Sequence, residues 1–250
     1  MNYYSLISSM NKAVGFDPDA QAFLTATGIT DPTISNAINQ LVLDLKSNSI
    51  WSKFTAIYPF VGGTGTTHKY NLKNPLDTDG AHRITYTGSP THNSSGIAFT
   101  GGSLGNTHII PSSHLTLNDT SISINSSTNV GSGVDISSSG CIAFYINYLG
   151  GFYSDMYNVL GGAGRLTVSN SNSIGFFTAS RLPGPLYNIY KNGTSLANSA
   201  VTAGSLGGSD LIFGAVGRTY DFVSIGLGLT TSEVGILTTI KSTFNTALGR

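Results

Sequence analysis

The sequence predicts a mainly β protein, an antiparallel β-sandwich with helices in its N-terminal part and one amphipathic helix near its C-terminus. Short runs of β-branched and aromatic residues, separated by Gly, Pro, Asn and Ser clusters, recur throughout residues 55–228. A helical period of apolar residues occurs instead at residues 31–47 and 231–248. A chain of 250 residues is long enough to form one such sandwich with a sizeable core.

The charge and composition of the chain argue against a nucleic-acid-binding protein and against a disordered one. Only 10% of the residues are charged, compared with roughly 25% in a typical protein, and the formal net charge is zero. A nucleic-acid partner is therefore not expected, because phosphate contacts require an excess of Lys and Arg. The 40% hydrophobic content argues against disorder. A neutral surface of hydroxyls and amides suits a protein that packs in an assembly.

Three further features limit the environment of the chain. Its single cysteine, Cys141, excludes an intrachain disulfide and is expected to be a buried thiol. The first residues lack a basic stretch followed by an apolar core, so no secretory signal is expected. No apolar run reaches the length of a membrane span, and no membrane partner is expected.

Residues 1–54 are predicted to be an arm and a helical segment used for attachment or packing. Residues 1–15 have no clear period and are expected to order only against a partner. An Asp-Pro start and a terminal Gly28 indicate a short helix over residues 17–28. Residues 31–47 form the clearest helix. It begins with Asp31-Pro32 and presents one apolar face, made of Ile34, Ile38, Leu41 and Leu45.

Residues 55–250 are predicted to form the sandwich. Residues 141–149 are apolar on both faces, which predicts a central strand that is covered on both sides. Residues 186–198 contain Asn192-Gly193 between two alternating runs, the sequence typical of a hairpin with a type I′ turn. The other predicted strands are residues 55–63, 68–73, 83–88, 96–102, 108–111, 121–125, 156–162, 165–170, 173–179, 211–217 and 221–228.

The sandwich is expected to be closed by a helix over residues 231–248. Thr230 and Glu233 form a T-x-x-E capping box at its start. Its apolar stripe consists of Leu237, Ile240, Phe244 and Leu248. Because the helix over residues 31–47 has an equivalent stripe, we expect both helices to lie near each other on the sandwich, on the side that faces an assembly.

The end of the chain carries a resemblance to known folds. The Asn192-Gly193 hairpin, the strand at residues 211–217, and DFVSIGLGLTTSE at residues 221–233 follow one another in the order seen in laminin-G-like, concanavalin A-like jelly-roll domains. Residues 96–124 look like the early part of the same fold. The resemblance implies a lectin-like jelly roll.

A second resemblance is to tailed-phage virion proteins. Residues 17–87 resemble a block that precedes such jelly rolls in those proteins, and residues 221–250 resemble the matching end. This implies a structural protein of the virion, such as a head fibre, a capsid decoration or a tail appendage. It also implies other virion proteins as partners and a homo-oligomer, most often a trimer.

The sequence contains no catalytic constellation, and no enzyme activity is expected. Glu occurs only at position 233, which disfavours a paired-carboxylate glycan depolymerase, and no G-x-S-x-G motif is present. No cofactor site is expected either. The two Gly-rich stretches, residues 101–106 and 161–165, do not lie between a parallel strand and a helix, where a phosphate group would bind.

No metal site is expected from the spacing of potential ligands. Asp77, Asp79 and Gly80 match the opening of a calcium loop, but the bidentate Glu that such a loop needs is missing, so a turn is favoured. The five histidines lack zinc-site spacing.

The most aromatic loop, residues 148–157, is the candidate contact surface. Exposed aromatic rings beside Asn and Asp suit either stacking on sugars or contact with a neighbouring subunit. Its candidate residues are Tyr148, Phe152, Tyr153 and Tyr157. The function expected first is therefore a non-enzymatic virion structural protein, and the alternative is a carbohydrate-binding adhesion module that contacts host or mucus glycans.

Overall fold

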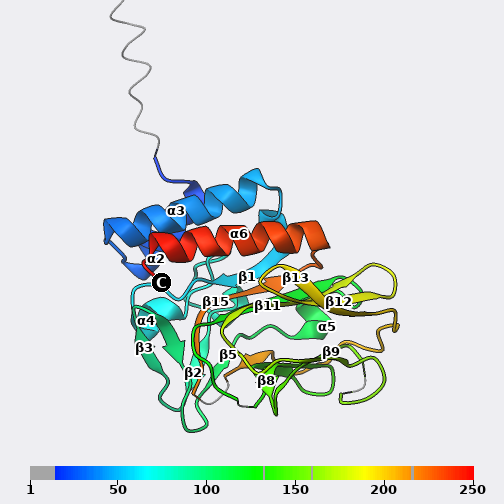
Figure 1. Ribbon diagram of the computed structural model, residues 1–250. Coiled ribbons are helices and arrows are strands. Elements are labelled where there is room, and N and C mark those ends of the chain that lie inside the picture. The colour runs from blue at the N-terminus through cyan, green and yellow to red at the C-terminus, as the bar shows by residue number, and fades with distance from the viewer. Residues whose placement is uncertain (1–14, 132, 159, 215–216) are drawn as a thin grey trace, which may run out of the picture.

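The computed structural model describes residues 15–131, 133–158, 160–214 and 217–250. Two antiparallel sheets pack face to face, and a layer of helices covers the outer face of one of them (Figure 1). The predicted mainly β sandwich with N-terminal helices and a C-terminal helix is confirmed. The expected arm at residues 1–15 lies outside the described residues except for Gly15.

The sheet beneath the helices has eight strands, and β15 (Thr219–Gly226) is central to it. β15 pairs with β6 (Thr120–Ser126), with β4 (Gly96–Ala98) and with β1 (Phe54–Tyr58). The remaining strands are β3 (Thr91–Asn93), β11 (Gly175–Leu182), β12 (Leu186–Lys191) and β13 (Thr194–Ser199). Asn192 and Gly193 connect the last two with φ angles of 50° and 79°, so the predicted type I′ hairpin is confirmed.

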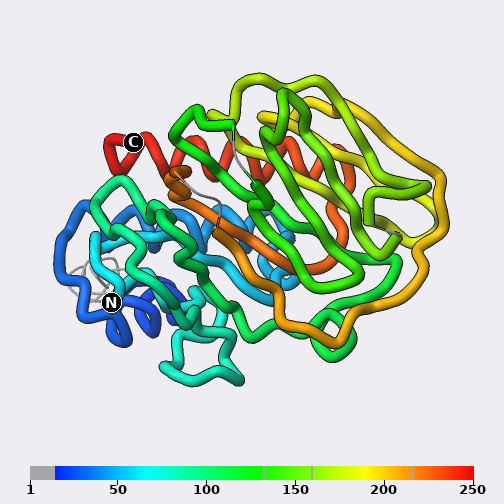
Figure 2. Tube along the Cα trace, turned by 90° about the horizontal axis from the view of Figure 1, so that it is seen from below, coloured from blue at the N-terminus to red at the C-terminus, as the bar shows by residue number. Residues whose placement is uncertain are grey.

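The second sheet has seven strands and faces away from the helices (Figure 2). Its order is β10-β9-β8-β7-β14-β5-β2. These strands are β10 (Leu166–Ser169), β9 (Gly151–Met156), β8 (Ile142–Tyr148), β7 (Ile136–Ser138), β14 (Ile212–Phe213), β5 (Leu104–Asn106) and β2 (Thr85–Thr87).

The core between the sheets follows from alternation along the strands. Ile122 and Ile124 of β6 and Phe144 and Ile146 of β8 belong to the same buried cluster. Side chains two residues apart point to the same face of a sheet, so each strand contributes every second residue to this core. The opposite face of each sheet is left for helices or solvent.

The helices form a second core on the outer face of the eight-stranded sheet. It joins α2 (Pro18–Thr27), α3 (Pro32–Ser47) and α6 (Thr231–Ala247) to Phe176 and Phe222 of the sheet. The caps are those predicted: Asp31 accepts hydrogen bonds from the backbone N–H of Thr33 and Ile34, and Thr230 and Glu233 form the capping box. Because α3 and α6 lie side by side, the expected proximity of these two helices is confirmed (Figure 1).

Short helical turns complete the described fold: η1 (Trp51–Lys53), α4 (Gly65–His68), η2 (Asp79–Ala81) and α5 (Pro111–His114). Within the described ranges, no helix combines the length and the apolar character needed to cross a membrane.

Candidate ligand-binding face

The outer face of the seven-stranded sheet is open, which corrects the expectation for residues 141–149. Phe144 is buried between the sheets, but Tyr145 is only half-buried on the outer face and Tyr148 is exposed. An apolar residue on the second face therefore does not mean that another layer covers it. Here it forms part of a surface.

Cross-strand pairing aligns the side chains of this face in one row. Ile212 of β14 pairs with Asn106 of β5 and with Ser137 of β7. Ser137 in turn pairs with Ala143 of β8, which pairs with Asp155 of β9. Residues paired in this way lie on the same side of the sheet.

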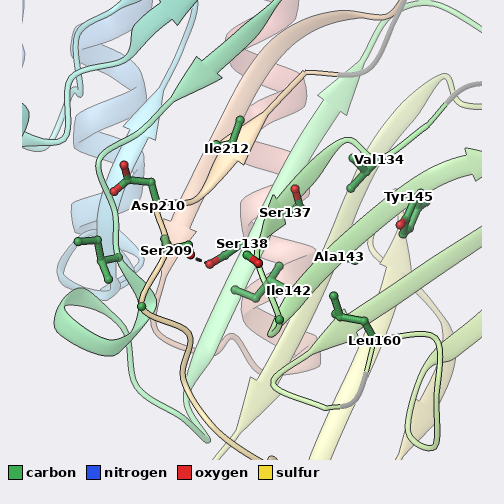
Figure 3. Close-up of a pocket in the computed structure, with 14 residues that line it drawn as sticks. Val134, Ser137, Ser138, Ile142, Ala143, Tyr145, Leu160, Ser209, Asp210 and Ile212 are labelled. Carbon is green, nitrogen blue, oxygen red and sulfur yellow. Dashed lines mark hydrogen bonds between the residues drawn. The ribbon is translucent and has the colours of Figure 1, made fainter. Parts of the chain in front are cut away.

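A groove of about 760 Å³ crosses this row. Tyr145 and Leu160 lie on one side of it, and Ser209 and Asp210 lie on the other (Figure 3). The other lining residues are Ile110, Val134, Ser137, Ser138, Ser139, Gly140, Ile142, Ala143, Gly208 and Ile212. The groove is thus a mixture of small apolar groups, serine hydroxyls and one carboxylate.

The wall that carries Asp210 is held by two hydrogen bonds. The Asp210 carboxylate accepts one from Nδ2 of Asn106 at 2.8 Å, and the hydroxyl of Ser138 donates to the Ser209 carbonyl at 2.7 Å. Within the described part of the chain, the hydroxyls of Ser137 and Ser139 have no hydrogen-bond partner. They are therefore available to a ligand, as is the second oxygen of Asp210.

Three tyrosines cluster beside the groove. The ring centroids of Tyr145 and Tyr148 lie 5.6 Å apart, and that of Tyr153 lies 6.4 Å from Tyr145 and 6.5 Å from Tyr148. The Tyr153 ring passes directly over Gly151, where an added Cβ would lie 2.6 Å from ring carbons. Glycine at this position is therefore what lets the ring lie against the strand.

The opposite wall is anchored by the buried carboxylate of Asp155. It accepts hydrogen bonds from Nδ2 of Asn158 at 2.9 Å, from the Gly161 N–H at 3.2 Å and from Nε of Arg165 at 2.9 Å. The hydrogen bond to Asp155 raises the pKa of Arg165 further above its already high value. Asp155 thus fixes the loop that carries Leu160 while it neutralises the guanidinium.

Arg165 also lies against the tyrosines. Its Cζ is 5.7 Å from the ring centroid of Tyr145 and 5.6 Å from that of Tyr153. A guanidinium at this distance is attracted to the aromatic ring. The groove wall, the ion pair and the aromatic cluster are therefore one connected unit.

The predicted contact surface is wrong for two of its four residues, Phe152 and Tyr157. Phe152 is 0% exposed and Tyr157 is 1% exposed, and both belong to the core between the sheets. Tyr148 (43% exposed) and Tyr153 point outward, because Phe152 and Tyr153 are neighbours on one strand and point to opposite faces. Contact through Tyr148 and Tyr153 remains a prediction. Tyr145, Arg165 and Asp210 were not predicted as site residues. Alternation along residues 141–149 did place Tyr145 on the other face of the strand from Phe144.

The carboxylates of the acidic turn at residues 77–80 form ion pairs with nearby Lys and Arg side chains. Asp77 accepts hydrogen bonds from Lys69 and Arg83, and Asp79 pairs with Arg83. Over the described ranges, no group of three or more His, Cys, Asp and Glu residues could hold a metal ion. Four of the five histidines pack in pairs, with the His82 and His114 ring centroids 4.6 Å apart and the Nδ1 atoms of His68 and His92 3.1 Å apart.

The fold is similar to part of two solved structures. The chain is similar to the botulinum neurotoxin serotype D binding domain, with a TM-score of 0.57 at 12% sequence identity over 77% of this chain and 53% of that chain. It is also similar to the binding domain of botulinum neurotoxin DC in complex with rat synaptotagmin II, with a TM-score of 0.53 at 12% identity over 77% of this chain and 52% of that one. This chain therefore spans about half the length of these domains. No family model and no curated protein matches the chain.

Proposed function

We propose that the chain is a lectin-like binding module that holds a glycan in the groove on its open sheet face. One observation carries the proposal: the groove brings together an aromatic ring and a serine hydroxyl on strands β8 and β7 with a second serine hydroxyl and a carboxylate on the adjoining loops. The fold shared with receptor-binding domains supports a binding role. The absence of an enzyme activity remains a prediction.

The chemistry of the groove matches that of a sugar. A pyranose has an apolar face, which stacks on an aromatic ring such as Tyr145, and a rim of hydroxyls. Those hydroxyls can donate to the Asp210 carboxylate and exchange hydrogen bonds with Ser137 and Ser139. Because Tyr145 and Ser137 lie on strands and Asp210 is hydrogen-bonded to Asn106 of β5, binding requires little reordering of these side chains.

A glycan array tests this proposal. The wild-type chain should bind a subset of glycans, and a Y145A/Y153A double variant should lose this binding. An L43A variant is the matched control, since Leu43 is exposed on α3, on the opposite side of the sandwich. The absence of any bound glycan, with and without calcium, would refute the proposal.

We also propose that the module is carried on a virion as a homo-oligomer, most simply a trimer. The resemblance of residues 17–87 and 221–250 to phage virion proteins supports this. The layer of α2, α3 and α6 lies on the other side of the sandwich from the groove. Attachment to a particle through residues 1–54 and the helices would therefore leave the groove facing away from the particle. Light scattering of the purified chain tests the trimer. Deletion of residues 1–15 tests attachment, and incorporation of the shortened chain into particles would refute the role of the arm.

A further inference from the structure

We infer that the groove selects neutral glycans and rejects acidic ones. The inference rests on the proposed function and adds the class of sugar. It follows from the charges that a ligand would meet. None of the residues that line the groove carries a positive charge, and Asp210 supplies a negative one.

The carboxylate of Asp210 is only partly satisfied by the protein. Its one hydrogen bond from Asn106 occupies Oδ2, and Oδ1 remains without a partner among the described residues. A carboxylate can accept further hydrogen bonds from two vicinal hydroxyls of a neutral sugar. The carboxylate of a uronic or sialic acid would instead be repelled, because two like charges in a partly desolvated groove disfavour binding.

Arg165 does not supply the positive charge that an acidic sugar would need, because it is already paired with Asp155. It is the positive side chain beside Tyr145 and Tyr153, but both Nε and Nη2 bind the Asp155 carboxylate. The Asp155 side chain is 0% exposed, whereas that of Arg165 is 26% exposed. An acidic sugar that drew Arg165 away from Asp155 would leave a buried carboxylate without its counter-ion, which is a strongly unfavourable state.

His114, which contacts the groove residue Ile110, does not change this balance. His114 is the last residue of α5, and its Nδ1 accepts a hydrogen bond at 2.9 Å from the N–H of Ile110, the N-cap of that helix. A ring that accepts at Nδ1 carries its proton on Nε2 and is neutral.

Affinity electrophoresis tests the inference with mannan and galactan as neutral probes and with alginate and polygalacturonate as acidic probes. The wild-type chain should be retarded by at least one neutral probe and bind the acidic probes at least about tenfold more weakly. D210N keeps the shape of the side chain and removes its charge. It should weaken neutral binding by about tenfold and reduce the discrimination against acidic probes. D44N on α3 changes the net charge equally, far from the groove, and should have no effect.

The outcomes separate the inference from the proposed function. Equal or tighter binding of alginate or polygalacturonate by the wild-type chain would overturn the inference while leaving a glycan-binding module. Unchanged discrimination in D210N would overturn the role of Asp210. Binding to none of the probes, together with an empty glycan array, would overturn both.

Discussion

The carboxylate of Asp155 and the guanidinium of Arg165 form an ion pair that joins the loop at residues 158–165 to the tyrosine cluster. The carboxylate is fully buried and also holds Asn158 and Gly161. Arg165 is sandwiched between this carboxylate and the rings of Tyr145 and Tyr153. The pair therefore shapes the groove as well as stabilising it.

Arg165→Met should be strongly destabilising because it leaves Asp155 charged and buried. Breaking a buried pair by removing one partner costs about 3 kcal/mol or more. Arg83→Met is the matched control: Arg83 pairs with the exposed Asp77 and Asp79, so its loss should destabilise the chain far less. Urea unfolding of both variants measures the difference. Equal stabilities would contradict the structural role of the buried pair.

Leu149→Asn should stabilise the chain. Leu149 and Gly150 form the turn between β8 and β9 with φ angles of 49° and 78°, and Leu149 is 83% exposed. A left-handed conformation costs a leucine about 1 kcal/mol, whereas asparagine adopts it readily. Thermal unfolding should show the gain. The reverse change in the equivalent turn, Asn192→Leu, should lower stability. This loss should exceed the gain from Leu149→Asn, because the change also removes the hydrogen bond that the Phe176 N–H donates to the Asn192 side chain.

His68 should make stability depend on pH. Burial, followed by the nearby His92 and Arg250, lowers the pKa of His68 from 6.5 to about 3. Between these values the unfolded chain binds a proton that the folded chain does not. Stability from this group is therefore complete above pH 6.5 and is lost as the pH falls toward about 3.

The size of this effect can be measured with His68→Phe, which fills the same site without titrating. The wild-type chain should lose about 1.4 kcal/mol relative to the variant for each pH unit within this window. His114→Gln, at an exposed histidine, is the control. A difference between wild type and His68→Phe that does not change with pH would show that His68 titrates normally.

Local patterns in the sequence predicted most of the fold. The caps at Asp31 and Thr230, the Asn192-Gly193 turn and the stripes of α3 and α6 each depend on residues a few positions apart. Such interactions are determined by the neighbouring residues, so a sequence contains enough information to infer them.

The groove could not be predicted in the same way. It depends on the pairing of Ser137 with Ile212 and on loops that bring Leu160 and Asp210 to opposite walls. These positions are far apart in the chain, and nothing in their local sequence fixes the register between them. Tyr157 was placed on the surface for a related reason: its aromatic neighbours were visible, but the hydrogen bond of its hydroxyl to Thr120 in the core was not.

Amide chemical-shift mapping can show whether a glycan binds on the open sheet face. The isotopically labelled chain would be titrated with oligosaccharides of the glycan that binds most strongly on the array. We expect the largest shifts at Ser137, Ala143, Tyr145 and Asp210, and none along α3. Shifts concentrated on α3 and α6, with the groove amides unchanged, would contradict this expectation.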